Sequence, residues 1–157
     1  LCPFAQKPFS EGKIRYVLYE GQEQDEIVEL FLKEAHYLNA VSNKKVETTL
    51  LIHPHFCRDF YNYLDWIHLA EELLKVNNLE GHLQIASFHP DYQFAGTHTA
   101  DVENYTNRSP FPMIHLLREE SIEQALQHFA HPERIPETNI RKMKEMGEEA
   151  ILKILKS

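Results

Sequence analysis

Two histidines occupy corresponding places in this chain, each at the end of a segment typical of a buried strand and each followed by proline. His53 closes the segment 46–53, and His89 closes the segment 82–89. An imidazole can move a proton near neutral pH or ligate a metal. If the two strands are neighbours, His53 and His89 could share either task. They could equally be surface rings where proline stops an ordinary strand.

A possible anion site follows in the segment 107–112, which precedes an expected short helix over 112–119. Asn107 and Ser109 offer polar groups there, and Ser109 could cap the helix. Arg108 beside a helix N-terminus could hold a carboxylate or a phosphate. Alternatively, Arg108 pairs with a surface acid such as Glu103.

His115 and Arg118 would lie on the same side of that short helix, because residues three apart are neighbours on a helical surface. His115 then either faces the pocket of Arg108 as an acid or base, or is a core histidine with its own hydrogen bonds. Arg118 would add a second cation to the anion site.

The two cysteines are interpreted differently. Cys2 could be a nucleophile or metal ligand if a histidine lowers the pKa of its thiol, although an ordinary buried cysteine is the more frequent case. Cys57 is interpreted as structural. Zinc needs three or four ligands, and the tentative set is His53, His89 and His115. Further donors of the right type are present at His55, His98, Asp91 and Cys2.

Asp91, Tyr92 and Tyr105 are the candidates for lining a ligand pocket next to these groups. They belong to a long polar segment over 90–112, and long loops in compact domains are often functional. The neighbouring aromatic residues Phe88 and Phe94 could contribute to the same lining. Aromatic side chains are more often core residues, and that interpretation is favoured.

Hydrophobic periodicity predicts the elements that must position these residues. Strands are expected over 13–20, 46–53 and 82–89; helices over 25–38, from Pro54 to about Asn77, over 112–119, from a capping box of Ser121 and Gln124 to Phe129, and from Pro136 to Lys156. In the last helix Ile140, Met143, Ala150, Ile151 and Ile154 are expected to point inward, and Gly147 weakens the middle. Helical crossovers between strands imply parallel pairing. The expected fold is an α/β domain over 1–157, with a small, mostly parallel sheet of three to four strands in the order β-α-β-α-β-loop-α-α-α.

Composition limits the possible partners. The chain has 157 residues and a net charge of −8, which disfavours nucleic acid. No apolar run approaches the length of a membrane span, and no signal peptide is visible. Two cysteines form no disulfide framework, so a soluble protein of the cytoplasm is expected. The chain opens with Leu1, so its natural N-terminus is expected to lie further upstream. The oligomeric state is left open.

The segments CPFA, TTLLIHP, SFHPDYQFAG and NYTNRSPFPMIHLLRE resemble an uncharacterised bacterial family, domain of unknown function 1415, over nearly the whole chain. The resemblance implies no particular reaction. It implies a helix before CPFA and shifts the emphasis from the pair His53–His89 to His89 with His115 and Arg108. The motif positions that it marks are Cys2, Pro3, His89, Asp91, Tyr92, Asn104, Tyr105, Asn107, Arg108, Ser109, His115 and Arg118.

Two functional hypotheses follow. In the first, the chain is a small-molecule enzyme for hydrolysis or group transfer on an anionic substrate, which Arg108 holds while His89, His115 or Cys2 does the chemistry. In the second, it is a non-catalytic module that binds a metabolite, a metal or a protein, and the polar loop is held in shape by its own hydrogen bonds. A divalent metal such as zinc is the possible cofactor.

Overall fold

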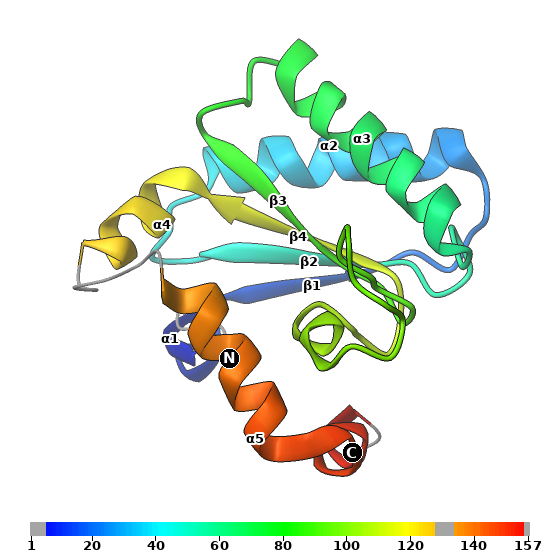
Figure 1. The fold of residues 1–157 in the computed structure, drawn as a ribbon. Helices are drawn as coiled ribbons and strands as arrows, with labels where there is room; N and C mark the ends of the chain where they lie inside the picture. The colour runs from blue at the N-terminus through cyan, green and yellow to red at the C-terminus, as the bar shows by residue number, and fades with distance from the viewer. Residues whose placement is uncertain (1–5, 128–133, 156–157) are drawn as a thin grey trace.

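From β1 to β3 the elements follow the predicted order, and they depart from it before and after that part of the chain (Figure 1). The computed structural model describes residues 6–127 and 134–155. Its elements are α1 (Gln6–Ser10), β1 (Ile14–Leu18), α2 (Gln24–Ala40), β2 (Thr48–Ile52), α3 (Phe60–Val76), β3 (Leu83–Phe88), the 3₁₀ helix η1 (Val102–Thr106), β4 (Met113–Arg118), α4 (Glu119–Leu126) and α5 (Ile135–Leu155). The predicted α/β class is therefore correct, while α1 and η1 were not foreseen.

The sheet has the order β1-β2-β4-β3 and is mostly antiparallel, so the prediction of a mostly parallel sheet is wrong. Only β1 and β2 pair in parallel; β4 runs antiparallel to both β2 and β3. The three strands foreseen do point the same way, because β3 and β2 both oppose β4. Their carboxyl ends consequently meet at one edge of the sheet, called the carboxyl edge below.

The segment 112–119 was expected to be a helix, and most of it is the strand β4. Ile114 and Leu116 are fully buried, whereas Met113, His115 and Leu117 are half-buried on the other face. This two-residue alternation suits a strand. Short apolar runs are ambiguous between helix and strand, and pairing with two neighbours decides the matter here. The anion site predicted at a helix N-terminus after Pro110 therefore has no helix.

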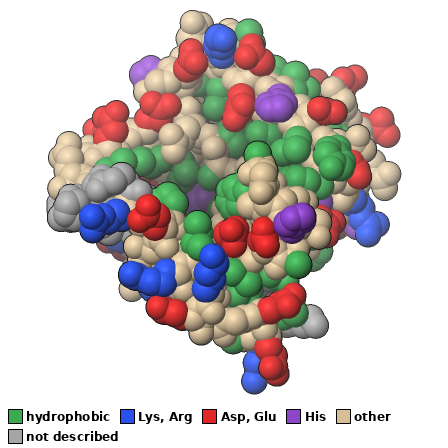
Figure 2. Space-filling model, in the orientation of Figure 1, with side chains coloured by type: hydrophobic (Ala, Val, Ile, Leu, Met, Phe, Trp, Pro, Cys, Tyr) green, Lys and Arg blue, Asp and Glu red, His purple; other side chains and the backbone are tan. Residues whose placement is uncertain are grey.

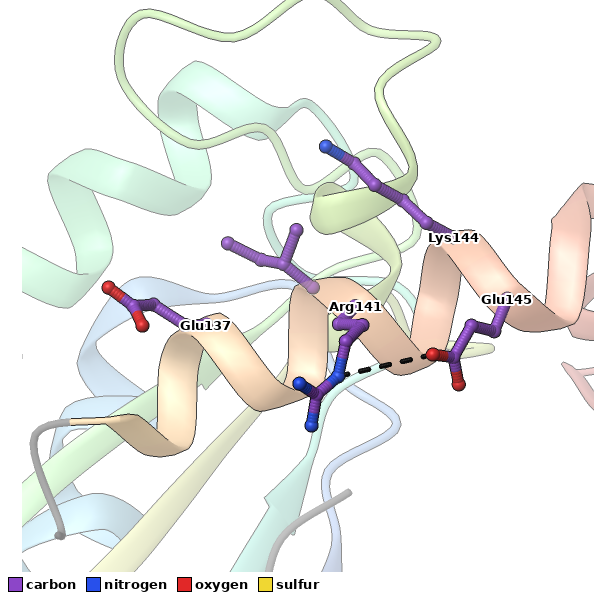
Figure 3. Close-up of a pocket in the computed structure, with 5 residues that line it drawn as sticks. Glu137, Arg141, Lys144 and Glu145 are labelled. Atoms are coloured by element: carbon purple, nitrogen blue, oxygen red, sulfur yellow. Dashed lines mark ion pairs between the residues drawn. The ribbon is translucent and has the colours of Figure 1, made fainter.

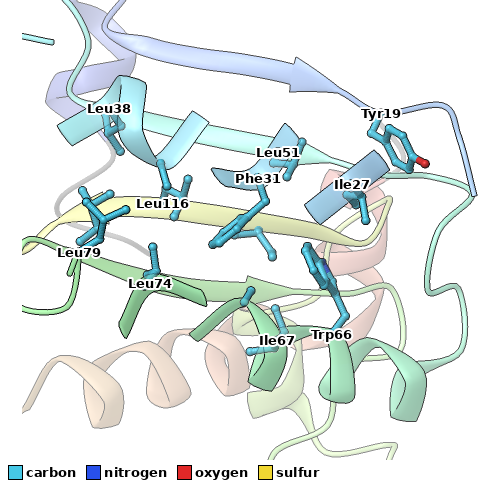
Figure 4. Close-up of a cluster of buried hydrophobic side chains, with 14 of the residues drawn as sticks. Tyr19, Ile27, Phe31, Leu38, Leu51, Trp66, Ile67, Leu74, Leu79 and Leu116 are labelled. Carbon is cyan, nitrogen blue, oxygen red and sulfur yellow. The ribbon is translucent and has the colours of Figure 1, made fainter. Parts of the chain in front are cut away.

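One face of the sheet is covered by α2 and α3, and the core lies between these layers (Figures 1 and 4). Ile27 and Phe31 of α2 and Leu51 of β2 are fully buried there. The other face carries η1 and α5, where Tyr105 packs with Met143 and Ile151. β1 is less covered on that face, because Tyr16 and Leu18 are each 58% exposed.

The helix expected from Pro54 begins later, at Phe60. Asp59 is its N-cap, and the Asp59 carboxylate accepts hydrogen bonds from the backbone N–H groups of Tyr61 and Asn62 at 3.0 Å. Such caps satisfy N–H groups that the first helical turn leaves unpaired. Residues 54–59 form a turn instead, and this turn crosses the carboxyl edge.

The last helices also differ from expectation. α4 begins at Glu119 with Arg118 as its N-cap residue, so Ser121 lies inside the helix and the capping box is wrong. Its predicted end at Phe129 lies outside the described residues, as does Lys156. In α5, Gly147 has φ 75° and ψ 157° and kinks the helix. A residue with this backbone conformation is nearly always glycine.

The kink changes which side of α5 faces the protein. Met143 and Ile151 are buried as predicted, but Ala150 is exposed and Ile154 is 60% exposed. Ile140 is half-buried. The prediction assumed one continuous helical period, and the turn at Gly147 breaks that period.

On the face shown in Figure 2, carboxylates are spread among apolar side chains, in keeping with the net charge of −8. Across the described segments, no helix is both long enough and apolar enough to traverse a lipid bilayer.

An ion pair between the partly exposed Arg15 and the buried Glu34 ties β1 to α2 and generates a first prediction. Arg15 donates to both carboxylate oxygens of Glu34, at 2.6 and 3.0 Å, and Glu34 is only 2% exposed. The substitution Arg15→Met should destabilise the fold by about 2 kcal/mol, because it leaves a buried carboxylate without its partner. The double variant Arg15→Met/Glu34→Leu should recover most of that loss in chemical denaturation. No recovery in the double variant would contradict this account.

Candidate functional site

A buried aromatic and imidazole cluster lies at the carboxyl edge of the sheet. His53 follows β2, His89 follows β3, and the ring of Tyr63 from α3 lies between them. All three side chains are 0% exposed. The Tyr63 ring centroid is 6.0 Å from that of His53 and 5.0 Å from that of His89. The two histidines at strand ends are thus brought together through a tyrosine that the sequence analysis did not single out.

His53 has one nitrogen engaged and one unengaged. Its Nδ1 lies 3.0 Å from the carbonyl oxygen of Phe56, and because a carbonyl only accepts, Nδ1 carries the proton. Its Nε2 is then an unprotonated acceptor. This atom is buried and has no hydrogen-bond partner. Burial lowers the pKa of His53 from 6.5 to about 4, so the ring is neutral at physiological pH.

Both nitrogens of His89 are engaged. Its Nδ1 accepts a hydrogen bond from the backbone N–H of Asp91 at 3.0 Å, so Nε2 carries the proton and donates to the carbonyl oxygen of Cys57 at 3.3 Å. Burial lowers the pKa of His89, while the carbonyl of Cys57 and the carboxylate of Asp91 oppose that shift. His53 and His89 are therefore fixed as opposite tautomers.

The hydroxyl of Tyr63 joins the two strands that end or begin at this edge. It donates to the carbonyl oxygen of Met113 and accepts from the backbone N–H of Phe88, both at 2.8 Å. Burial raises the pKa of Tyr63, so the hydroxyl keeps its proton. Backbone groups at the end of a sheet need such partners when they are buried.

Cys57 lies in the turn 54–59 next to the histidines. Its φ of 53° is left-handed, which is uncommon for a residue with a side chain. Burial raises the pKa of the Cys57 thiol to about 11, and Asp65 and Asp59 add to the shift. The thiol is therefore protonated at neutral pH and is a poor nucleophile. Cys2 lies outside the described residues.

Arg108 is used to hold the loop 90–112 in shape. Its Nε donates to the carbonyl oxygen of Tyr92 at 3.2 Å and its Nη2 to that of Thr99 at 2.6 Å. The guanidinium also lies 4.4 Å from the ring centroid of Tyr105. These contacts replace the alternative partner Glu103 considered from the sequence. They also leave the guanidinium with fewer donors for a ligand anion.

Asn107 and Ser109 join the same loop to β3. The Asn107 side chain donates to the carbonyl oxygen of Ser87 at 3.0 Å, and its backbone carbonyl accepts from the N–H of His89 at 3.2 Å. Ser109 donates to the carbonyl oxygen of Phe111 at 2.6 Å rather than capping a helix. These two side chains are therefore engaged with backbone groups.

Asn104 is a fully buried centre of the loop. Its side-chain oxygen accepts from Phe94 N–H and from the Thr97 hydroxyl, and its amide donates to the carbonyl oxygen of His98. The candidate pocket residues have similar structural contacts. Tyr92 packs against Phe60 and Phe94, Tyr105 donates to Glu148 at 3.0 Å, and Asp91 is exposed.

His115 and Arg118 lie apart from this cluster. His115 is on the opposite sheet face, where its Nε2 is 2.6 Å from the Thr48 hydroxyl, and burial lowers its pKa to about 4. Arg118 lies at the opposite end of β4 and donates to the carbonyl oxygens of Val41 and Val46. Residues three apart on a strand face opposite sides, which separates the pair that a helix would have joined.

The tentative metal set is not assembled. His53 and His89 are on the α2/α3 side of the sheet, whereas His115 is on the other side. In residues 6–127 and 134–155, no group of three or more His, Cys, Asp and Glu side chains could hold one ion.

A surface hollow of about 490 Å³ lies along α5, away from these residues (Figure 3). It is lined by Glu137, Ile140, Arg141, Lys144 and Glu145, and Arg141 pairs with Glu145 at 3.9 Å. None of these is a predicted site residue. The charged side chains are exposed, and Figure 3 shows them extending away from the helix axis.

Comparison with known proteins gives a family and no activity. A family model described as "Protein of unknown function (DUF1415)" matches residues 1–153. Neither the curated proteins nor the solved structures contain a match to the chain.

The two hydrogen bonds of the Tyr63 hydroxyl generate a second prediction. The substitution Tyr63→Phe keeps the ring and removes the hydroxyl, which leaves the Phe88 N–H and the Met113 carbonyl without this partner. We expect a loss of about 2 kcal/mol in the free energy of unfolding. Tyr61→Phe on the exposed side of α3 is the matched control and should change little. Amide hydrogen exchange at Phe88 should also accelerate. Equal stability of the two variants would contradict the stabilising role of the Tyr63 hydroxyl.

The pKa of His53 generates a third prediction. Unfolded histidine titrates near 6.5 and folded His53 near 4, so the folded state resists protonation. The contribution of His53 to the free energy of unfolding is complete above pH 6.5 and is lost as the pH falls toward 4. The total loss is about 3 kcal/mol. The His53→Gln variant should therefore lose less free energy of unfolding than wild type does as the pH falls from 6.5 to 4. His68→Gln, at an exposed position of α3, should lose as much as wild type does, and identical losses for both variants would refute the assignment.

Proposed function

Because the chain belongs to the DUF1415 family, whose description assigns no activity, we propose a function from the geometry: it is a small-molecule enzyme with His53 as its acid–base group. The observation that carries the proposal is the buried Nε2 of His53, an acceptor without a partner. Buried polar atoms are usually hydrogen-bonded, and a catalytic role is one of the explanations for an exception. Among the described residues, Thr49 Oγ1, Trp66 Nε1 and Arg118 Nε are also buried without a partner, but only His53 carries a group that transfers protons readily. The place supports it too, because His53 follows β2 of the parallel pair β1–β2, and ligands of parallel α/β sheets bind beyond the carboxyl ends of the strands.

The neighbours of His53 suit proton transfer. The carbonyl of Phe56 holds Nδ1–H and so keeps the lone pair on Nε2. If Nε2 takes a proton from a substrate, the same carbonyl stabilises the imidazolium that forms. His89 has both nitrogens engaged and the Tyr63 hydroxyl bridges two strands, so neither side chain offers a free group for proton transfer. This assignment moves the acid–base role from His89 and His115 to His53.

The second hypothesis, a non-catalytic binding module, is favoured by a different observation. Arg108, Asn104, Asn107 and Ser109 are all engaged within the protein. A loop held in this way presents a fixed surface without offering reactive groups. The enzyme hypothesis is preferred because the internal bonds of this loop leave the unpartnered nitrogen of His53 unexplained.

The fourth prediction tests turnover. Wild type, His53→Gln and His115→Gln are incubated with a small-molecule extract of cells, and compounds are followed by mass spectrometry. A compound should be converted by wild type and by His115→Gln, whereas His53→Gln should be slower by about 100-fold or more, because acid–base groups typically contribute 10²–10⁴. His115 has a similarly lowered pKa on the other sheet face and is therefore the matched control. Far-ultraviolet circular dichroism confirms that each variant is folded.

Two outcomes would contradict the proposal. Equal conversion by His53→Gln would remove His53 from the chemistry. A compound that is bound by all three proteins and recovered unchanged would favour the binding module instead.

A further inference from the structure

The ring of Phe56 occupies a slot between three elements at the carboxyl edge. Its centroid lies 6.4 Å from that of Tyr19 after β1, 5.9 Å from that of His53 after β2, and 5.7 Å from that of Trp66 on α3. All three contacts are edge-on, at 74–89°. Figure 4 shows Tyr19, Ile27 and Trp66 together at this end of the core. The slot is thus shaped for one flat ring.

Two walls of this slot carry buried polar atoms without a protein partner. One is the acceptor Nε2 of His53, and the other is the donor Nε1 of Trp66, whose side chain is 3% exposed. Each such atom costs about 1–3 kcal/mol when it is left unpaired. A hydrocarbon ring such as Phe56 satisfies neither. A ring of the same size with one N–H donor and one nitrogen or oxygen acceptor carries the two groups that complement these atoms.

The Phe56 ring fills the slot, and it is the group that would have to leave for a ligand to enter. Phe56 lies in the turn 54–59, is half-buried, and its hydrogen bonds are made by the backbone: its carbonyl accepts from His53 and its N–H donates to the carbonyl of His53 at 3.3 Å. Rotation of the side chain alone would therefore vacate the slot and leave the tautomer of His53 unchanged. Exposing the ring costs about 1.5–3 kcal/mol at most, which a bound ring offsets.

The charges around the slot disfavour an anion. The Tyr19 hydroxyl is 3.1 Å from a carboxylate oxygen of Glu26, and the first turn of α2 contains Asp25 and Glu26. Asp59 caps α3 on the other side. Arg58 is exposed in the turn, and Arg108 is engaged with backbone carbonyls. Carboxylates close to a site of low polarity raise the free energy of a bound anion.

We propose that the ligand is a small planar nitrogen heterocycle, neutral or cationic, which replaces the Phe56 ring and hydrogen-bonds to His53 Nε2 and Trp66 Nε1. This inference rests on the proposed function, because it names the substrate class of the same site. It replaces the anionic substrate that the sequence suggested through Arg108. The heterocyclic N–H faces the acid–base nitrogen, and the acceptor atom receives the indole N–H.

The fifth prediction uses benzimidazole as the probe, since it is planar and carries one N–H and one acceptor nitrogen. Indene has the same shape without either group, and benzoate is a planar anion. Binding is measured by NMR titration of wild type, Phe56→Ala and Phe60→Ala. Phe56→Ala should bind benzimidazole at least tenfold tighter than wild type does, and at least tenfold tighter than it binds indene or benzoate. Phe60→Ala, which removes a ring beside His89 and Tyr92, should show no gain.

The polar partners are tested within the enlarged slot. Phe56→Ala/Trp66→Phe and Phe56→Ala/His53→Gln should each lose most of the preference for benzimidazole over indene, and the ¹⁵N shift of His53 Nε2 should move on binding. Phe56→Leu serves if Phe56→Ala does not fold. Indene binding as tightly as benzimidazole, or an equal gain in Phe60→Ala, would overturn the inference. If turnover depends on His53 but benzimidazole is not preferred over indene, the proposed function stands and this inference fails. If benzimidazole is preferred but no compound is turned over, the binding site stands and the proposed function fails.

Discussion

The hydroxyl of Tyr63 holds the carboxyl edge of the sheet together. It accepts a hydrogen bond from the last residue of β3 and donates one to the first residue of β4, so a side chain continues the ladder where the strands separate. The same ring keeps His53 and His89 apart and buried. Because the hydroxyl must stay protonated to do this, burial that raises its pKa is part of the arrangement.

The two histidines illustrate how the same His-Pro step at a strand end acquires different chemistry. Each follows a strand and precedes a proline, yet one ring is protonated on Nδ1 and the other on Nε2. The difference comes from the loops. The turn after β2 returns a carbonyl to Nδ1 of His53, whereas the loop after β3 returns an N–H to Nδ1 of His89. Backbone geometry therefore assigns the free lone pair to His53.

The sequence was informative where local pattern decides structure. The short strand-like segments 46–53 and 82–89, each ending in a His-Pro step, located both histidines at one edge. The family was recognised from its motifs. The strand β4 was missed because five apolar or aromatic residues in a row fit either element, and only its neighbours β2 and β3 settle the question. That error placed His115 and Arg118 in the site, where they do not lie, and supplied a helix N-terminus that does not exist.

Other features had no local signal. Tyr63 and Trp66 fit the apolar period of α3, so nothing in the sequence distinguishes them from ordinary core residues. The motif residues Asn104, Asn107 and Arg108 looked like binding groups, and their partners are backbone carbonyls and N–H groups whose positions depend on the folded loop. Polar side chains that stabilise a loop and those that bind a ligand have the same composition.

The position of β4 has a consequence for biosynthesis. β2 and β3 are not neighbours, and the strand between them is made last, more than 60 residues after β2. A nascent chain that has emerged only as far as β3 therefore lacks one of the two inner strands of its sheet. Such non-local pairing slows folding and keeps strand edges open meanwhile. The sheet is completed only when the segment containing β4 has left the ribosome.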